Sequence, residues 1–166
     1  NDLKLSIDNI TTDSGQIKNL LVSINGTKDK HQISVKSIVL SHQLAIDIKG
    51  HYEDSMLWNG DIETFTIKGK ALGSWYQKHK TQLIVSQEKM QINKFCLVEG
   101  KLSSLCVNGV LDQKDNGQEQ QSNAQLKLSH IDLKRFKAFL PKEIVELSGV
   151  IDIDADVNMK ELLEAD

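Results

Sequence analysis

Residues 151–157 read Ile151-Asp152-Ile153-Asp154-Ala155-Asp156-Val157, so that an apolar side chain stands at every odd position and an aspartate at every even one. A period of two places successive side chains on opposite faces of a β-strand. Similar alternation recurs at Leu44, Ile46 and Ile48 and in many other runs. Antiparallel sheets that bury one face show this pattern, whereas buried parallel strands read as continuous apolar runs. The chain is therefore predicted to be all-β and antiparallel.

Turn-forming residues separate the alternating runs at short intervals. Residues 12–15, 25–29 and 99–101 contain Gly, Asn, Asp or Ser, which tolerate positive φ or hydrogen-bond their own backbone. This spacing predicts about ten strands in an antiparallel meander. We expect the polar, Gln-rich stretch from Gln113 to Ser122 to be a mobile hairpin tip. The tail, residues 159–166, contains helix-forming residues, and its structure is left open.

One segment departs from the alternation. Between Asp132 and Pro141 the apolar residues Leu133, Phe136 and Leu140 follow helical spacing. Asp132 can cap the start of a helix, and the proline disfavours helical backbone at the residue before it. We therefore expect one short amphipathic helix in an otherwise all-β chain.

Length and charge exclude several classes of protein. The 166 residues suit a single domain. A net charge of −3 argues against nucleic-acid binding, because such domains are usually strongly basic. No apolar run approaches the roughly 18 residues that a membrane-spanning helix needs. The pattern alone leaves a sandwich, a small barrel and a long curved sheet open as architectures. The inward residues are mostly aliphatic rather than aromatic, which suits acyl chains as well as an ordinary core.

An ordered set of motifs resembles the TamB family, the inner-membrane components of the translocation and assembly module, which belong to the AsmA-like group. The motifs lie between about residues 40 and 158, whereas residues 1–40 show only generic alternation. They are Leu57-Trp58-Asn59-Gly60, Gly73-Ser74-Trp75, Phe95-Cys96-Leu97, Leu105-Cys106-Val107, the Leu133-to-Pro141 helix and Leu147-Ser148-Gly149-Val150.

The resemblance implies a long antiparallel sheet curved into an open hydrophobic groove, a β-taco or half-pipe. It implies a periplasmic location in a Gram-negative bacterium, anchoring in the inner membrane outside this fragment, and an outer-membrane barrel partner of the TamA type. Residues 1–166 would be a single segment of that longer groove. Family members are associated with phospholipid transport between the two membranes and with outer-membrane protein assembly.

The groove hypothesis assigns the aliphatic positions of the alternating runs to the lining. These positions are Leu44, Ile46, Ile48, Ile62, Leu83, Val85, Ile92, Leu126, Leu128, Ile151 and Ile153.

The two cysteines, Cys96 and Cys106, lie almost symmetrically about Gly100-Lys101. A hairpin centred there would place them opposite each other, close enough for a disulfide. In an oxidising compartment we expect the bond to form. The alternative is a pair of small, reduced core residues.

The remaining polar residues suggest no enzymatic site. The five histidines are scattered and are expected at the surface; they are His31, His42, His51, His79 and His130. The aspartates at 152, 154 and 156 are interpreted as a solvated strand face, since the glycine and distal glutamate of a calcium loop are absent. Lys134, Arg135 and Lys137 are interpreted as the wet face of the helix, with contact to lipid headgroups as the alternative.

From the resemblance we predict a segment of a periplasm-spanning groove that conducts phospholipids between the two membranes, supports outer-membrane protein assembly, or does both. It would hold acyl chains without enzymatic chemistry and need no cofactor and no metal. The first alternative is a scaffold for outer-membrane β-strands that pair with the sheet edges. The second is a closed, single-domain lipid carrier.

Overall fold

The computed structural model describes residues 2–12, 15–53, 56–112, 120–139 and 146–161, and these form one long antiparallel sheet with a short 3₁₀ helix, η1. The elements are β1 (Asp2–Thr12), β2 (Gly15–Thr27), β3 (Lys30–Val39), β4 (His42–Tyr52), β5 (Trp58–Gly69), β6 (Gly73–Gln77), β7 (Thr81–Val85), β8 (Lys89–Glu99), β9 (Ser103–Asp112), β10 (Gln120–Asp132), η1 (Leu133–Phe139) and β11 (Val150–Glu161).

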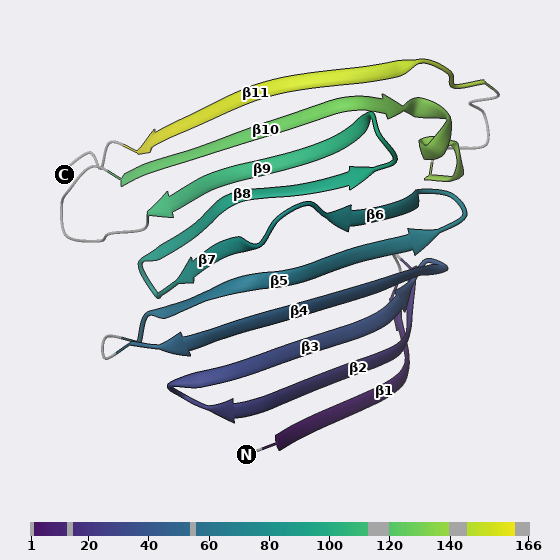
Figure 1. Ribbon diagram of the computed structural model, residues 1–166. Coiled ribbons are helices and arrows are strands. Elements are labelled where there is room, and N and C mark those ends of the chain that lie inside the picture. The colour runs from purple at the N-terminus through teal and green to yellow at the C-terminus, as the bar shows by residue number, and fades with distance from the viewer. Residues whose placement is uncertain (1, 13–14, 54–55, 113–119, 140–145, 162–166) are drawn as a thin grey trace.

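The strands follow one another as an antiparallel meander from β1 to β11, in which each described strand pairs with the next except β6 with β7 (Figure 1). The short strands β6 and β7 share one position, because both pair with β5 and with β8. The predicted meander of about ten strands is thus confirmed. At about 4.8 Å per strand, the ten positions extend for about 43 Å along the hydrogen-bonding direction.

Irregularities in the strand pairing interrupt several of the long strands and bend the sheet. The register shifts between Lys18 and Leu21 in β2, between Ile92 and Phe95 in β8, and between Leu128 and Ile131 in β10. Each interval contains one residue at positive φ, namely Asn19 (51°), Lys94 (48°) and His130 (52°). Bulges of this kind increase local twist and curvature. They explain how strands of up to 13 residues bend within one sheet.

The segment after β10 is helical, as predicted, but its geometry is that of a 3₁₀ helix over Leu133–Phe139. The Lys134 amide donates to Asp132 Oδ1 at 2.9 Å, so Asp132 caps the first turn. Leu140 and Pro141 lie outside the described residues. In Figure 1 the helix lies at the end of β10, beside one end of the sheet.

One expectation about the connections is corrected. Gln120–Ser122 belong to β10, and Ser122 is buried, so the predicted hairpin tip does not include them; residues 113–119 of that tip lie outside the described residues. The tail, whose structure the sequence left open, is extended as far as Glu161, because it pairs with β10 from Gln120 onward. Residues 162–166 are not described.

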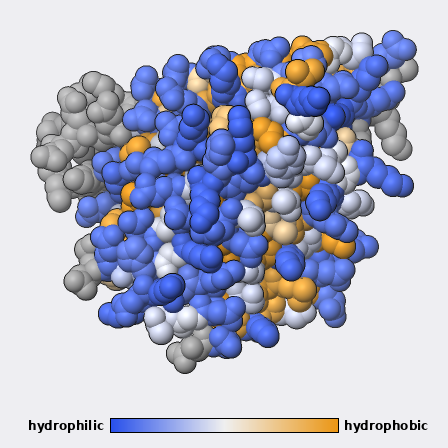
Figure 2. Space-filling model, in the orientation of Figure 1, coloured by the Kyte–Doolittle hydropathy of each residue, from blue (hydrophilic) through white to orange (hydrophobic). Residues whose placement is uncertain are grey.

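The sheet is open. Within the described residues no pairing joins β1 to β11, so it is neither a barrel nor a closed carrier. The surface area is 11945 Å² for 18.6 kDa, against about 8,200 Å² expected for a compact protein of that mass. The excess indicates that the apolar face is not enclosed. The face in view in Figure 2 is mainly hydrophilic, as expected for the outer side of a groove.

Candidate functional site: an apolar groove with two unlike rims

The strand register places every predicted lining residue on one face of the sheet. Direct cross-strand partners share a face, so the rows can be followed from strand to strand. One row is Leu5, Val22, Val35, Ile46 and Phe65. A second is Gly60, Leu83, Ile92, Gly109, Ala124 and Val157. A third is Leu97, Leu105, Leu128 and Ile153.

The apolar face is only partly shielded from solvent. Ile62 is 6% exposed, whereas Leu126 is 36% exposed, and the other predicted lining residues fall between burial and exposure. A closed core of this size would bury most of its aliphatic side chains fully. The described residues therefore form an open apolar floor rather than a finished core.

The strand pairing beneath the apolar floor is interrupted where β6 ends and β7 begins. Gln77 Nε2 donates to the Ile62 carbonyl at 2.9 Å and fills the gap in the ladder, while Thr81 is completely buried. Phe65 of β5 and Phe95 of β8 meet edge to face, with centroids 5.5 Å apart. Their strands are two positions apart, about 9.6 Å in a flat sheet. The two rings therefore lie closer together than their strands would in a flat sheet, as expected where the apolar face is concave.

One rim of the groove is apolar. The row at this end of the strands consists of Tyr52, Trp58, Val85, Met90 and Leu111. The Trp58 ring lies over Gly50 and Gly60, where an added Cβ would collide with it. Trp58 Nε1 donates to His31 Nε2 at 2.7 Å, so the indole packs without losing a hydrogen bond. Tyr52 is 51% exposed, and the row thus reaches solvent.

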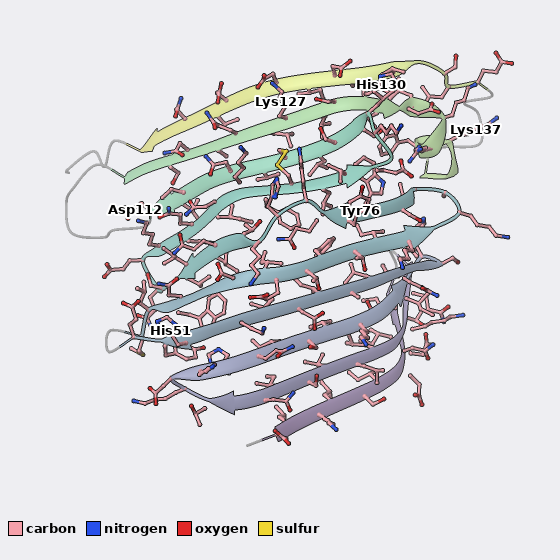
Figure 3. All side chains as sticks on the ribbon, viewed as in Figure 1. His51, Tyr76, Asp112, Lys127, His130 and Lys137 are labelled. Carbon is pink, nitrogen blue, oxygen red and sulfur yellow. A yellow bond between two sulfur atoms is a disulfide. The ribbon has the colours of Figure 1, made fainter. Side chains whose placement is uncertain are left out.

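The opposite rim, called the polar rim here, carries an inward ion pair and is tied together by η1, although Leu40, Leu102 and Phe136 are also exposed at this end. Arg135 Nη1 pairs with Glu99 Oε2 and donates to the Leu72 carbonyl at 3.1 Å. Glu99 Oε1 accepts from the Ser74 amide at 3.0 Å. Gly73, at φ 83°, leaves the space that the Glu99 carboxylate occupies. In Figure 3, Lys137 of η1 lies at this end, whereas His51 and Asp112, next to Tyr52 and Leu111, lie at the other.

The expectation that all histidines lie at the surface is wrong for His42. This side chain is 7% exposed, its Nδ1 lies 2.8 Å from the Leu40 carbonyl, and its Nε2 accepts from the Leu72 amide at 3.2 Å. It packs against Gly69 at the polar rim. Nothing in the spacing of histidines indicates this, because the contacts join different hairpins.

The outer face carries the polar half of the alternation. Ser34 Oγ donates to Asp47 Oδ1 at 2.5 Å and Thr64 Oγ1 donates to Oδ2 at 2.9 Å; chiefly the Ser34 bond holds the pKa of Asp47 below its ordinary value of 3.8. Lys127 donates to Asp154 at 2.8 Å, which raises the pKa of Lys127. The aspartate run of β11 is therefore a solvated face, as predicted.

Cys96 and Cys106 are direct cross-strand partners and form a disulfide, with Cα atoms 4.1 Å apart. The predicted bond is thus present in the structure. It lies on the outer face, immediately after the bulge at Lys94, and ties β8 to β9 there. Cys96 is buried although it faces away from the groove.

The sequence reasoning missed lining residues that follow bulges. Phe65, Phe95 and Ile131 lie on the apolar face three positions after Ile62, Ile92 and Leu128. A step of three in an otherwise period-two pattern is the signal that could have identified both the bulges and these residues.

Among the described residues, no group of three or more metal-ligating side chains comes together. The described helical structure offers no apolar helix long enough to span a bilayer. A search of curated proteins and a search of solved structures each found no match to the chain. A family model described as TamB, N-terminal domain, matches residues 1–164, and the protein therefore belongs to the TamB family.

Proposed function

We propose that this chain is a section of a periplasmic hydrophobic groove that conducts phospholipids between the inner and outer membranes. Membership of the TamB family suggests a membrane-associated bacterial protein. The observation that supports a lipid conduit is the apolar face, which continues through ten strand positions and stays partly open to solvent. Anchoring in the inner membrane and contact with a TamA-type barrel would belong to other parts of the full protein.

The proposed mechanism is physical and requires no enzyme chemistry and no cofactor. Acyl chains would lie along the cross-strand rows, and headgroups would remain in water. Each chain carbon removed from water contributes about 0.8 kcal/mol. The residues along each row are largely aliphatic, so neighbouring positions of an acyl chain along a row differ little in energy. Small differences between positions favour sliding over trapping.

A scaffold for outer-membrane β-strands is the second candidate. Among the described strands, β1 and β11 have one neighbour each, so each presents a long edge with unpaired backbone groups. Such an edge can accept an added strand. In this alternative the edges carry the activity and the apolar face serves as packing.

The experiment that tests the conduit is photo-crosslinking in cells that express the full-length protein and contain phosphorus-radiolabelled lipid. A photoreactive residue replaces Leu126 on the apolar face or, separately, Lys127 on the outer face. Because Lys127 pairs with Asp154, a third variant at Gln125 probes the same outer face and leaves that ion pair intact.

Radiolabelled lipid attached at 126, and not at 125 or 127, is the result expected for a lipid-lined groove. Absence of lipid at all three positions, with crosslinks to outer-membrane protein instead, would favour the scaffold. Equal labelling on both faces would contradict the proposed groove.

A further inference from the structure

The two rims differ in polarity, and a phospholipid differs in the same way between its two ends. We propose that the polar rim binds the phosphate of the lipid headgroup through Arg135, so that lipids in the groove keep their headgroups at this one rim. This inference rests on the proposed function. It adds a headgroup site, which recognises the phosphodiester of the lipid.

Arg135 is held in place on one side only. Its Nη1 pairs with the Glu99 carboxylate and donates a hydrogen bond to the Leu72 carbonyl. Among the described residues, no hydrogen bond is recorded for Nη2 or Nε, and the side chain is 31% exposed. A guanidinium oriented by an ion pair on one edge can still offer the other edge to phosphate oxygens. Paired N–H donors match phosphate geometry.

The charge near η1 favours an anion. Lys134 and Lys137 are exposed on the same short helix, Glu99 is the acidic partner of Arg135, and Asp132 caps the first turn. Together with Arg135 these side chains carry a net charge of about +1 at neutral pH. The position is also at the edge of the apolar floor, because Ile131 and Leu97, both buried, precede Arg135 and Glu99 in their own segments. A headgroup at Arg135 would leave its acyl chains on the floor.

Among the described residues, the inward row of the opposite rim contains no arginine or lysine. This row is Tyr52, Trp58, Val85, Met90 and Leu111, all of which are apolar or aromatic. His31 also faces inward here, but its Nε2 accepts from Trp58 and its Nδ1 lies 3.1 Å from the Thr27 carbonyl, so both ring nitrogens already have partners. A phosphate placed on this row would lose hydration without a free cationic donor. The contrast between the rims therefore favours one orientation of the lipid over the reverse.

The test uses purified full-length protein and two photoactivatable lipids with identical acyl chains, phosphatidylglycerol and diacylglycerol, each with the reactive group in the chain. The variants are Arg135→Gln, which removes the charge, and Arg135→Lys, which keeps the charge but not the paired donors. Lys68→Gln, an exposed lysine of β5, is the matched control. The measured quantity is the lipid concentration at half-maximal labelling.

We expect Arg135→Gln to raise this concentration about tenfold for phosphatidylglycerol, equivalent to about 1.4 kcal/mol, and to leave diacylglycerol unchanged. Arg135→Lys should lie between wild type and Arg135→Gln, and Lys68→Gln should match wild type. Diacylglycerol labelling also reports whether each variant keeps the groove.

An equal loss for both lipids would mean that Arg135 is only structural, and no loss for phosphatidylglycerol would equally overturn the site. Binding of inorganic phosphate as tight as that of phosphatidylglycerol, with the same loss in Arg135→Gln, would overturn assignment to a lipid headgroup. Failure of wild type to label with either lipid would instead contradict the proposed function.

Discussion

A single charge on the groove floor should block lipid passage without unfolding the protein. Ile46 is the position of choice, because it lies between Val35 and Phe65 in a direct cross-strand row on the apolar face. Its neighbour Ala45 points to the outer face and lies opposite Lys36 and Thr66. Ile46→Asp and Ala45→Asp therefore place the same carboxylate at adjacent positions on opposite faces.

The expected effects follow from burial. Ile46 is half-buried, so its loss costs about half of a full side-chain burial, roughly 1–1.5 kcal/mol. An acyl chain that slides past the carboxylate introduced by Ile46→Asp must strip water from an unpaired charge, at about 3–4 kcal/mol. Each 1.36 kcal/mol in a barrier is about a factor of ten in rate. Passage should therefore slow by roughly 150- to 900-fold, while Ala45→Asp should keep the wild-type rate.

The assay compares the two full-length variants in cells that lack the endogenous protein. Protein accumulation is measured by immunoblot, and transfer is followed with radiolabelled phospholipid that appears in the outer membrane after a pulse. Leu126→Asp is the second floor variant and should behave like Ile46→Asp. Normal transfer by either floor variant at normal protein level would refute the conduit, and equal loss in Ala45→Asp would show that the effect is not specific to the floor.

Three further outcomes test the sheet itself. Replacing Cys96 and Cys106 with serine should lower the free energy of unfolding by about 2–3 kcal/mol in denaturant titrations. Thiol labelling of unfolded, unreduced wild type should detect no free thiol, and two free thiols would contradict the disulfide. Residue 94 has φ 48°, a conformation that glycine adopts readily and a β-branched residue does not. Lys94→Gly should therefore raise the free energy of unfolding by up to about 1 kcal/mol, and Lys94→Val should lower it by more. The same shift in melting temperature for both variants would contradict the bulge. Asp47→Asn should destabilise by about 1–2 kcal/mol at pH 7. The Ser34 bond lowers the folded-state pKa of Asp47. The stability difference between wild type and Asp47→Asn should therefore persist above the ordinary value of 3.8 and disappear as the pH falls through the folded-state pKa. A stability difference that grows as the pH falls would contradict the lowered pKa.

Much of the architecture could be predicted from local pattern. Alternation at residues 44–48, 126–128 and 151–157 identifies strands and sorts their two faces before any partner is known, because side-chain direction in a strand depends only on parity. The near symmetry of the two cysteines about Gly100 predicts their pairing, since a hairpin is a local structure.

Other features depend on contacts between segments far apart in sequence. The burial of His42 arises from the packing of Gly69 and the Leu72 amide against it. Arg135 reaches Glu99 across 36 positions and Leu72 across 63. No local pattern predicts such partners, because they depend on which hairpins the folded sheet brings to the same rim.

The strands and their apolar and polar faces could be predicted from single segments, because side-chain direction within a strand follows residue order; the quoted motifs carried the resemblance to the TamB family. Three features became visible only in the folded sheet: the apolar face is open, its inward row at Tyr52 is apolar, and an ion pair at Arg135 marks the other rim. The physical reason is that curvature and rim chemistry depend on register between strands. Bulges such as that at Lys94 set this register, and alternation within one strand does not specify it.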